Sequence, residues 1–186
     1  MRTFIAIELS EEIRKKIWAM IEELKGVSAP VKWVEQDNLH ITLKFLGEVP
    51  DKEIDNLISL STDAAEGVKP FAAEFAGVGT FPGGHHPRVI WVDTVKGREE
   101  QGDIASSLEE KLSNAGFRSE EREFKPHITV GRVREDKGLA KLLSKLEGLR
   151  GTNFGEMKID HVNIMKSRLS PKGPTYEIIK SIRLEQ

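Results

Sequence analysis

The sequence predicts an α+β fold of two similar antiparallel sheets, with helices on their outer faces and a central cleft between them. Two observations support this prediction. An apolar-flanked His-x-Thr-x motif occurs twice, at residues 40–43 and again 87 positions later at 127–130. Each copy is followed within a few residues by a helix-forming segment. We therefore expect residues 1–186 to form one bilobal domain in which the cleft carries both motifs.

The first half of the chain alternates between strand and helix patterns. Residues 2–9 are β-branched and apolar, and Ser10 before Glu11 and Glu12 is typical of a helix N-cap with an acidic first turn. The expected elements are a strand at 2–9, a helix ending at Gly26, strands at 31–34 and 40–45, a helix at 51–66 and a strand at 71–75. The glycine-rich residues 77–84 are expected to form a turn.

The second half repeats this alternation. The expected elements are a strand at 88–92, a helix at 99–115, a strand at 127–133, a helix at 139–149, and strands at 157–166 and 176–184. A turn-rich loop, 167–174, is expected to join the last two strands. The charged run 118–123 is more typical of a solvated connector than of a binding site.

Composition excludes several classes of protein. Hydrophobic residues make up 38% and charged residues 31% of the chain, and no apolar run approaches the length of roughly 18 residues that spans a bilayer. The apolar start of the chain is too short for a signal peptide, so we expect a cytoplasmic protein with no membrane association. We also expect a monomer. The absence of cysteine excludes disulfides, Cys-ligated zinc and a thiol nucleophile. A net charge of -2 argues against broad, non-specific nucleic-acid binding, but it permits a local basic cleft for one or two phosphates.

The two motifs have the pattern of strands with one chemically active face. Side chains alternate between the faces of a strand, so His40 and Thr42 share one face and the apolar residues between them share the other. The same holds for His127 and Thr129. On composition alone a given histidine has this context about once in 160 cases, yet two of the five histidines have it. We expect the apolar faces to lie in the core and the polar faces to meet in the cleft.

Two imidazoles that face each other across a cleft suit phosphodiester chemistry. One neutral ring can take a proton from the attacking oxygen, while one imidazolium gives a proton to the leaving oxygen. The hydroxyls of Thr42 and Thr129 can donate to the non-bridging phosphate oxygens. Arg132, Lys44 and Lys125 are candidates for additional positive charge, although the two lysines could equally be surface residues.

Other assignments of these residues are weaker. Neither motif has an Asp, Glu or second His at ligand spacing, so we expect no metal and no cofactor. His85 and His86 occupy a Gly- and Pro-rich segment typical of a turn, and His161 is expected to be packed or hydrogen-bonded. The aromatic residues are expected in the core, although one at the rim of the cleft could stack on a base: Trp33, Trp91, Phe45 and Tyr176.

With these residues in view, the chain resembles the two-histidine phosphoesterase superfamily, and within it the RNA 2',3'-cyclic phosphodiesterases, also called 2'-5' RNA ligase-like proteins. The resemblance extends over nearly the whole length and shows no departure at either motif. The matching segments are Phe4-Ile5-Ala6-Ile7, residues 38–47, Phe81-Pro82, residues 87–91, residues 125–132, Ser167-Arg168-Leu169 and residues 173–176.

The resemblance implies metal-independent hydrolysis of RNA 2',3'-cyclic phosphate ends to 2'-phosphomonoesters. Fragments of tRNA are among the expected RNA substrates. It implies that His40 gives a proton to the 3'-oxygen and that His127 activates water. The sequence pattern itself is the same around both histidines and does not assign these roles. The reverse reaction would join RNA ends through a 2'-5' linkage without a nucleotide cofactor. A non-catalytic module that binds RNA ends remains the alternative from another class of protein.

Overall fold

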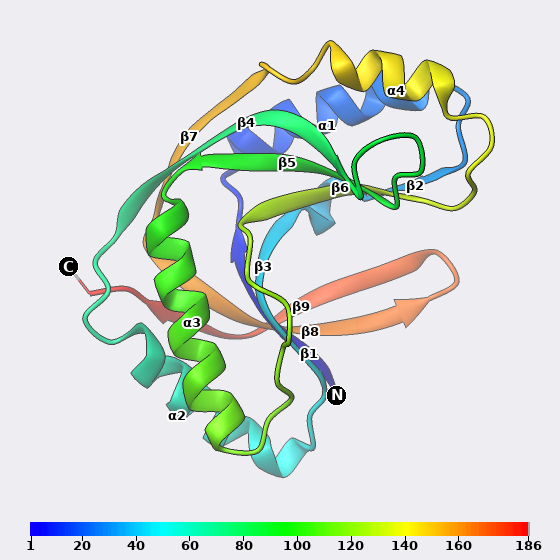
Figure 1. Ribbon diagram of the computed structural model, residues 1–186. Helices are drawn as coiled ribbons and strands as arrows, with labels where there is room; N and C mark the ends of the chain where they lie inside the picture. The colour runs from blue at the N-terminus through cyan, green and yellow to red at the C-terminus, as the bar shows by residue number, and fades with distance from the viewer. Residues whose placement is uncertain (186) are drawn as a thin grey trace.

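The computed structural model, which describes residues 1–185, has the predicted α+β architecture with two antiparallel sheets (Figure 1). The four-stranded sheet has the order β3-β1-β8-β9, and the five-stranded sheet has the order β2-β6-β5-β4-β7. The strands are β1 (Arg2–Glu8), β2 (Val31–Trp33), β3 (His40–Glu48), β4 (Phe71–Phe81), β5 (Val89–Lys96), β6 (His127–Val133), β7 (Asn153–Ile159), β8 (His161–Ser170) and β9 (Gly173–Arg183).

Four α-helices cover the outer faces of the sheets (Figure 1). They are α1 (Glu11–Lys25), α2 (Ile54–Ala65), α3 (Arg98–Asn114) and α4 (Ala140–Glu147), with short 3-10 helices η1 (Gln36–Asn38) and η2 (Asp51–Glu53). The hydroxyl of Ser10 accepts a hydrogen bond from the Ile13 amide, as expected for the N-cap of α1. Helices α1 and α4 pack on the five-stranded sheet, whereas α2 and α3 pack on each other and on the four-stranded sheet.

The apolar faces of both motif strands are buried. Ile41, Ile128 and Val130 have no exposed surface, and they belong to one hydrophobic core that extends under both sheets. Burial of side chains of this size stabilises each strand by roughly 1.5–3 kcal/mol per residue. Because the apolar face of each motif strand is buried in the core, the opposite face, which carries the histidine and the threonine, points away from the core.

Strand β4 is longer than the sequence predicts, because its glycines lie inside the strand instead of forming a turn. The pairing of β4 with β5 is irregular near Gly77, whose φ of +87° suits a bulge. At Gly79 an added Cβ would lie 2.8 Å from the ring of Trp91, so only glycine allows this close packing. The prediction of a turn at 77–84 is therefore wrong for residues 77–81, which belong to β4.

The C-terminal strands also differ from the prediction. The expected strand 157–166 is two strands, β7 and β8, separated at Asp160, where the chain passes from the five-stranded to the four-stranded sheet. Apolar, buried residues stand near the break on both sides, Ile159 at the end of β7 and Val162 near the start of β8, so the sequence does not show where one strand ends and the next begins. The expected loop 167–174 is mostly hairpin, because Ser170 pairs with Gly173 and only two residues form the turn. None of the helices within residues 1–185 is long and apolar enough to cross a membrane.

Candidate active site

A cleft of about 380 Å³ lies between the two sheets and brings both motifs together. His40 and Thr42 line it from β3, and His127 and Thr129 line it from β6. Arg132, the fifth residue selected from the sequence as a site residue, lines the same cleft. All five predicted site residues therefore reach one cavity, although their roles stay predictions.

A β-bulge at the fourth residue of each motif changes which later side chains face the cleft. Leu43 is the extra residue of β3 against β1, and Val130 is the extra residue of β6 against β5. A bulge shifts the alternation of side chains by one position. The fifth residue after each histidine, Phe45 in β3 and Arg132 in β6, consequently lines the cleft.

The bulge in β3 also turns Lys44 away from the cleft. Its ammonium group is buried and donates to the Glu109 carboxylate at 2.5 Å and to the Arg118 carbonyl at 2.7 Å. The prediction that Lys44 adds charge to the site is wrong, because it assumed an unbroken alternation. The side chain of Lys125 is exposed and does not line the cleft.

Backbone carbonyls hold both imidazoles in the same orientation. Nδ1 of His40 lies 2.7 Å from the Asn38 carbonyl oxygen, and Nδ1 of His127 lies 2.7 Å from that of Lys125. A carbonyl oxygen only accepts hydrogen bonds, so Nδ1 carries a proton in both rings and Nε2 is the atom that can gain or lose one. Nε2 of His40 lies 2.8 Å from the Thr42 hydroxyl.

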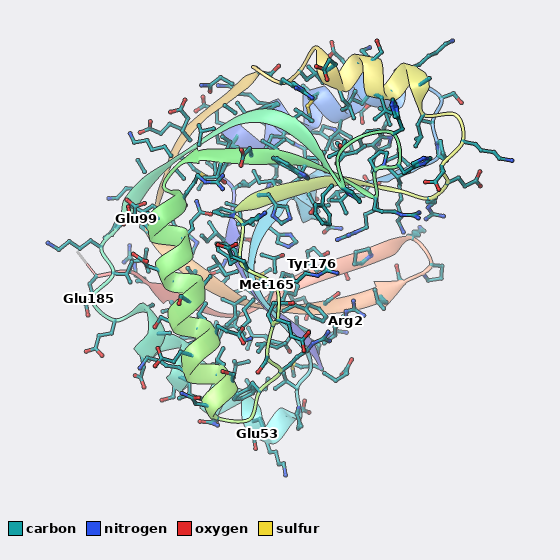
Figure 2. All side chains as sticks on the ribbon, viewed as in Figure 1. Arg2, Glu53, Glu99, Met165, Tyr176 and Glu185 are labelled. Atoms are coloured by element: carbon teal, nitrogen blue, oxygen red, sulfur yellow. The ribbon has the colours of Figure 1, made fainter. Side chains whose placement is uncertain are left out.

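The surroundings of His40 are aromatic. The ring of Phe4 lies 5.1 Å from its ring, and Tyr176 packs perpendicular to it at 5.3 Å between centroids. Figure 2 labels Tyr176 on β9, in the four-stranded sheet that also holds His40. Burial lowers the pKa of His40 below 6.5, and the charges of His127 and Arg132 lower it further, against the opposing hydrogen bond to Asn38. Burial also raises the pKa of Tyr176.

Each motif histidine lies opposite a carboxylate on the neighbouring strand. Glu8 of β1 pairs with His40, and its charge favours the imidazolium form of that ring. Asp93 of β5 pairs with His127, but its carboxylate binds the Arg98 guanidinium at 2.7 Å. Neither carboxylate stands near a motif in sequence, so only the strand pairing reveals them.

Asn38 is a further residue that the motif analysis did not select. Besides its carbonyl bond to His40, its side-chain amide donates to the Pro174 carbonyl at 2.9 Å. This bond ties the segment before β3 to the β8–β9 hairpin that carries Tyr176. Trp33, Phe45 and Tyr176, expected in the core, also line the cleft. Asn38 could have been selected from the sequence, because it stands two residues before a motif histidine.

The cleft is basic although the chain as a whole is acidic. Its lining includes Arg2, Lys32, Arg132 and Lys172, against the single carboxylate of Glu35. This local excess of positive charge suits an anionic ligand. The net charge of -2 for the whole chain is compatible with such a local basic cleft.

The remaining histidines lie outside the cleft. His85 and His86 are exposed, and His161 binds the Asp160 carboxylate at 2.6 Å, a hydrogen bond that lowers the pKa of Asp160. Within residues 1–185, no three His, Asp or Glu side chains gather in a way that could hold a metal ion.

Comparison with known proteins places the chain in a family. The model of the 2'-5' RNA ligase superfamily matches residues 13–170. The chain is 38% identical to the RNA 2',3'-cyclic phosphodiesterase of Methanocaldococcus jannaschii, over 97% of this chain and 99% of that protein. It is 40% identical to the protein of the same name from Archaeoglobus fulgidus, over 97% and 98%.

Solved structures agree with this relationship. The crystal structure of TT0787 of Thermus thermophilus has a TM-score of 0.82 at 27% identity and covers 99% of this chain and 98% of its own. E. coli LigT complexed with 3'-AMP has a TM-score of 0.79 at 26% identity, with coverage of 100% and 98%. Both the matched sequence and the fold thus lead to one conclusion: the chain belongs to the 2'-5' RNA ligase superfamily.

Proposed function

We propose that the protein is an RNA 2',3'-cyclic phosphodiesterase, which opens the cyclic phosphate at an RNA 3' end and leaves a 2'-phosphomonoester. The observation that carries the proposal is the pair of His-x-Thr strands that reach one basic cleft from two different sheets. The names of the relatives from M. jannaschii and A. fulgidus support the same activity. The reaction needs no metal and no nucleotide cofactor, because both proton transfers are within the capacity of imidazole.

In this mechanism the two Nε2 atoms have opposite tasks. Nε2 of His127 takes a proton from water, and the water oxygen attacks phosphorus. The bond between phosphorus and the 3'-oxygen breaks, and the imidazolium of His40 gives its proton to that oxygen. Thr42 and Thr129 donate hydrogen bonds to the non-bridging oxygens, where negative charge grows in the transition state.

Arg132 supplies the fixed positive charge for the phosphate. Its guanidinium can bind two phosphate oxygens at once, which orients phosphorus between the rings. The anionic substrate also counteracts the effect of burial on His40, because a nearby negative charge favours the imidazolium that the reaction consumes.

The second candidate is the ATP-independent 2'-5' RNA ligase, in which a 5'-hydroxyl takes the place of water, attacks the cyclic phosphate and forms a 2'-5' linkage as the bond to the 3'-oxygen breaks. The superfamily's name favours it, and the protein groups would have the same tasks. Activity as a monomer in the cytoplasm, and tRNA fragments as natural substrates, stay predictions.

End-group analysis of an RNA oligonucleotide with a 2',3'-cyclic phosphate tests the proposal. We expect opening to the 2'-phosphate that is unaffected by EDTA, and a loss of about 10²–10⁴-fold in His40→Ala and in His127→Ala. His161→Ala is the matched control, because this histidine lies outside the cleft, and it should keep full activity. Binding without opening would favour the non-catalytic module, and loss of activity with EDTA would contradict the mechanism.

A further inference from the structure

Strand β2 is the element by which the two motif-bearing sheets differ. In both sheets the motif strand is followed by three others, in the orders β3-β1-β8-β9 and β6-β5-β4-β7. The motif strand β3 forms a sheet edge, whereas β6 is covered on that side by β2. This additional strand therefore places side chains beside the second motif that have no counterpart beside the first.

The central residue of β2 is Lys32, and it lies directly opposite Arg132. Paired residues of antiparallel strands share a face, and both side chains line the cleft. Like charges in this arrangement repel each other and destabilise the sheet. Within residues 1–185 neither side chain forms an ion pair with a carboxylate that would relieve the repulsion. An anion in the cleft would relieve it.

One cyclic phosphate neutralises only part of the positive charge that lines the cleft. A cyclic phosphodiester carries a single negative charge, and Arg132 together with one imidazolium already exceeds it. Lys32 is then in surplus, as is Lys172 in the turn of the β8–β9 hairpin, which lines the cleft from the other sheet. In Figure 1, β2 and the turn of this hairpin lie at the same end of the space between the sheets.

We propose that Lys32, with Lys172 on the opposite wall, binds the phosphodiester next to the cyclic end, so that the site takes an RNA chain in preference to a cyclic mononucleotide. This inference rests on the proposed function, because Arg132 and the two threonines hold the cyclic phosphate. The neighbouring phosphate lies on the side of β2, and Lys32 binds it as a flexible point charge.

A structural role for Lys32 makes a different prediction. Lysines on edge strands discourage pairing with other chains, and β2 is an edge strand. Such a lysine protects the sheet without affecting the choice of substrate. The control is Lys158, which is exposed on β7, the other edge strand of the same sheet, and does not line the cleft.

The test compares three substrates with the same cyclic end: a trinucleotide, the same trinucleotide with an uncharged methylphosphonate at the neighbouring linkage, and a cyclic mononucleotide. For Lys32→Ala we expect kcat/KM to fall about tenfold on the trinucleotide, as for a lost charged hydrogen bond. On the other two substrates it should be unchanged. Lys172→Ala should show the same selectivity, and Lys158→Ala should behave like the unaltered protein.

The outcomes separate the two proposals. If the unaltered protein opens none of the three substrates, the proposed function fails. If it opens them and Lys32→Ala lowers all three equally, or none, the phosphate subsite is refuted and the edge-strand role remains. In Lys32→Ala we expect the melting temperature to rise by up to about 3 °C, because the repulsion from Arg132 is relieved. The same measurement shows that the variant is folded.

Discussion

Replacement of Lys44 by methionine should destabilise the protein without affecting catalysis. The side chain of Lys44 is 1% exposed and that of its partner Glu109 is 32% exposed. Loss of one member of a fully buried ion pair costs about 3–5 kcal/mol, because the other charge stays buried without a partner. Water reaches part of the Glu109 carboxylate, so we expect a loss of about 2–3 kcal/mol in the free energy of unfolding, or roughly 4–10 °C in melting temperature.

The loss should depend on pH. Burial raises the pKa of Glu109, but the hydrogen bond from Lys44, the Glu120 amide and the charge of Lys44 outweigh it, so the pKa lies below 4.5. A carboxyl group with a lowered pKa stabilises the fold above its unfolded-state pKa and loses that contribution as the pH falls through its folded-state pKa. The difference in stability between the two proteins should therefore be full at pH 7 and should shrink as the pH falls below 4.5.

Urea unfolding at several pH values, with steady-state kinetics at 25 °C, measures both effects. Lys96→Met is the control, because its pair with Glu156 is exposed and should contribute less than about 1 kcal/mol. If Lys44→Met kept its stability but lost kcat/KM as the histidine variants do, Lys44 would act in the cleft and our interpretation of the bulge would be wrong.

Three other predictions concern the cleft. Glu8→Gln should lower the pKa of His40 further, shifting the alkaline limb of kcat/KM to lower pH, whereas Asp93→Asn should leave that limb in place; an NMR titration of His40 and the pH–rate profile would measure this. Asn38→Ala keeps the carbonyl but loses the side-chain bond to the β8–β9 hairpin, so KM should rise several-fold while the Nδ1 proton of His40 remains bonded; an unchanged KM would contradict the role of that bond. Gly131→Ala should cost about 1–3 kcal/mol in urea unfolding, because its Cβ would lie 2.8 Å from a side chain of β2; full stability would show that β2 shifts freely.

Much of the fold followed from local patterns. The N-cap at Ser10 and the apolar periodicity of the helices are encoded within a few residues, so the helices were found nearly at their observed bounds. The extent of β4 and the division between β7 and β8 depend on which strands pair at a distance. A glycine in a bulge and a glycine in a turn look alike in sequence, and only the pairing of β4 with β5 shows that Gly77 and Gly79 lie inside a strand.

The site residues likewise divide into those that a local pattern places and those that depend on how the strands pair. The motif histidines and threonines could be predicted because alternation within one strand places them, whereas Lys44 could not be placed because the bulge at Leu43 interrupts that alternation. Glu8 was missed for a related reason. Its relation to His40 is a matter of strand register, which no local pattern in the sequence specifies.

The two motifs are alike in sequence, so their division into acid and base must come from what surrounds them. Glu8 pairs with His40 and its charge acts to raise the pKa of that ring, but burial together with the charges of His127 and Arg132 outweighs this effect, so the pKa of His40 lies below 6.5. The equivalent Asp93 is bound by Arg98, so the carboxylate opposite His127 already has a partner of its own. His127 is also the more exposed of the two histidines. Strand register and ion pairing thus make the surroundings of the two histidines unequal, whereas the assignment of His40 as the acid and His127 as the base stays a prediction from the resemblance to known enzymes.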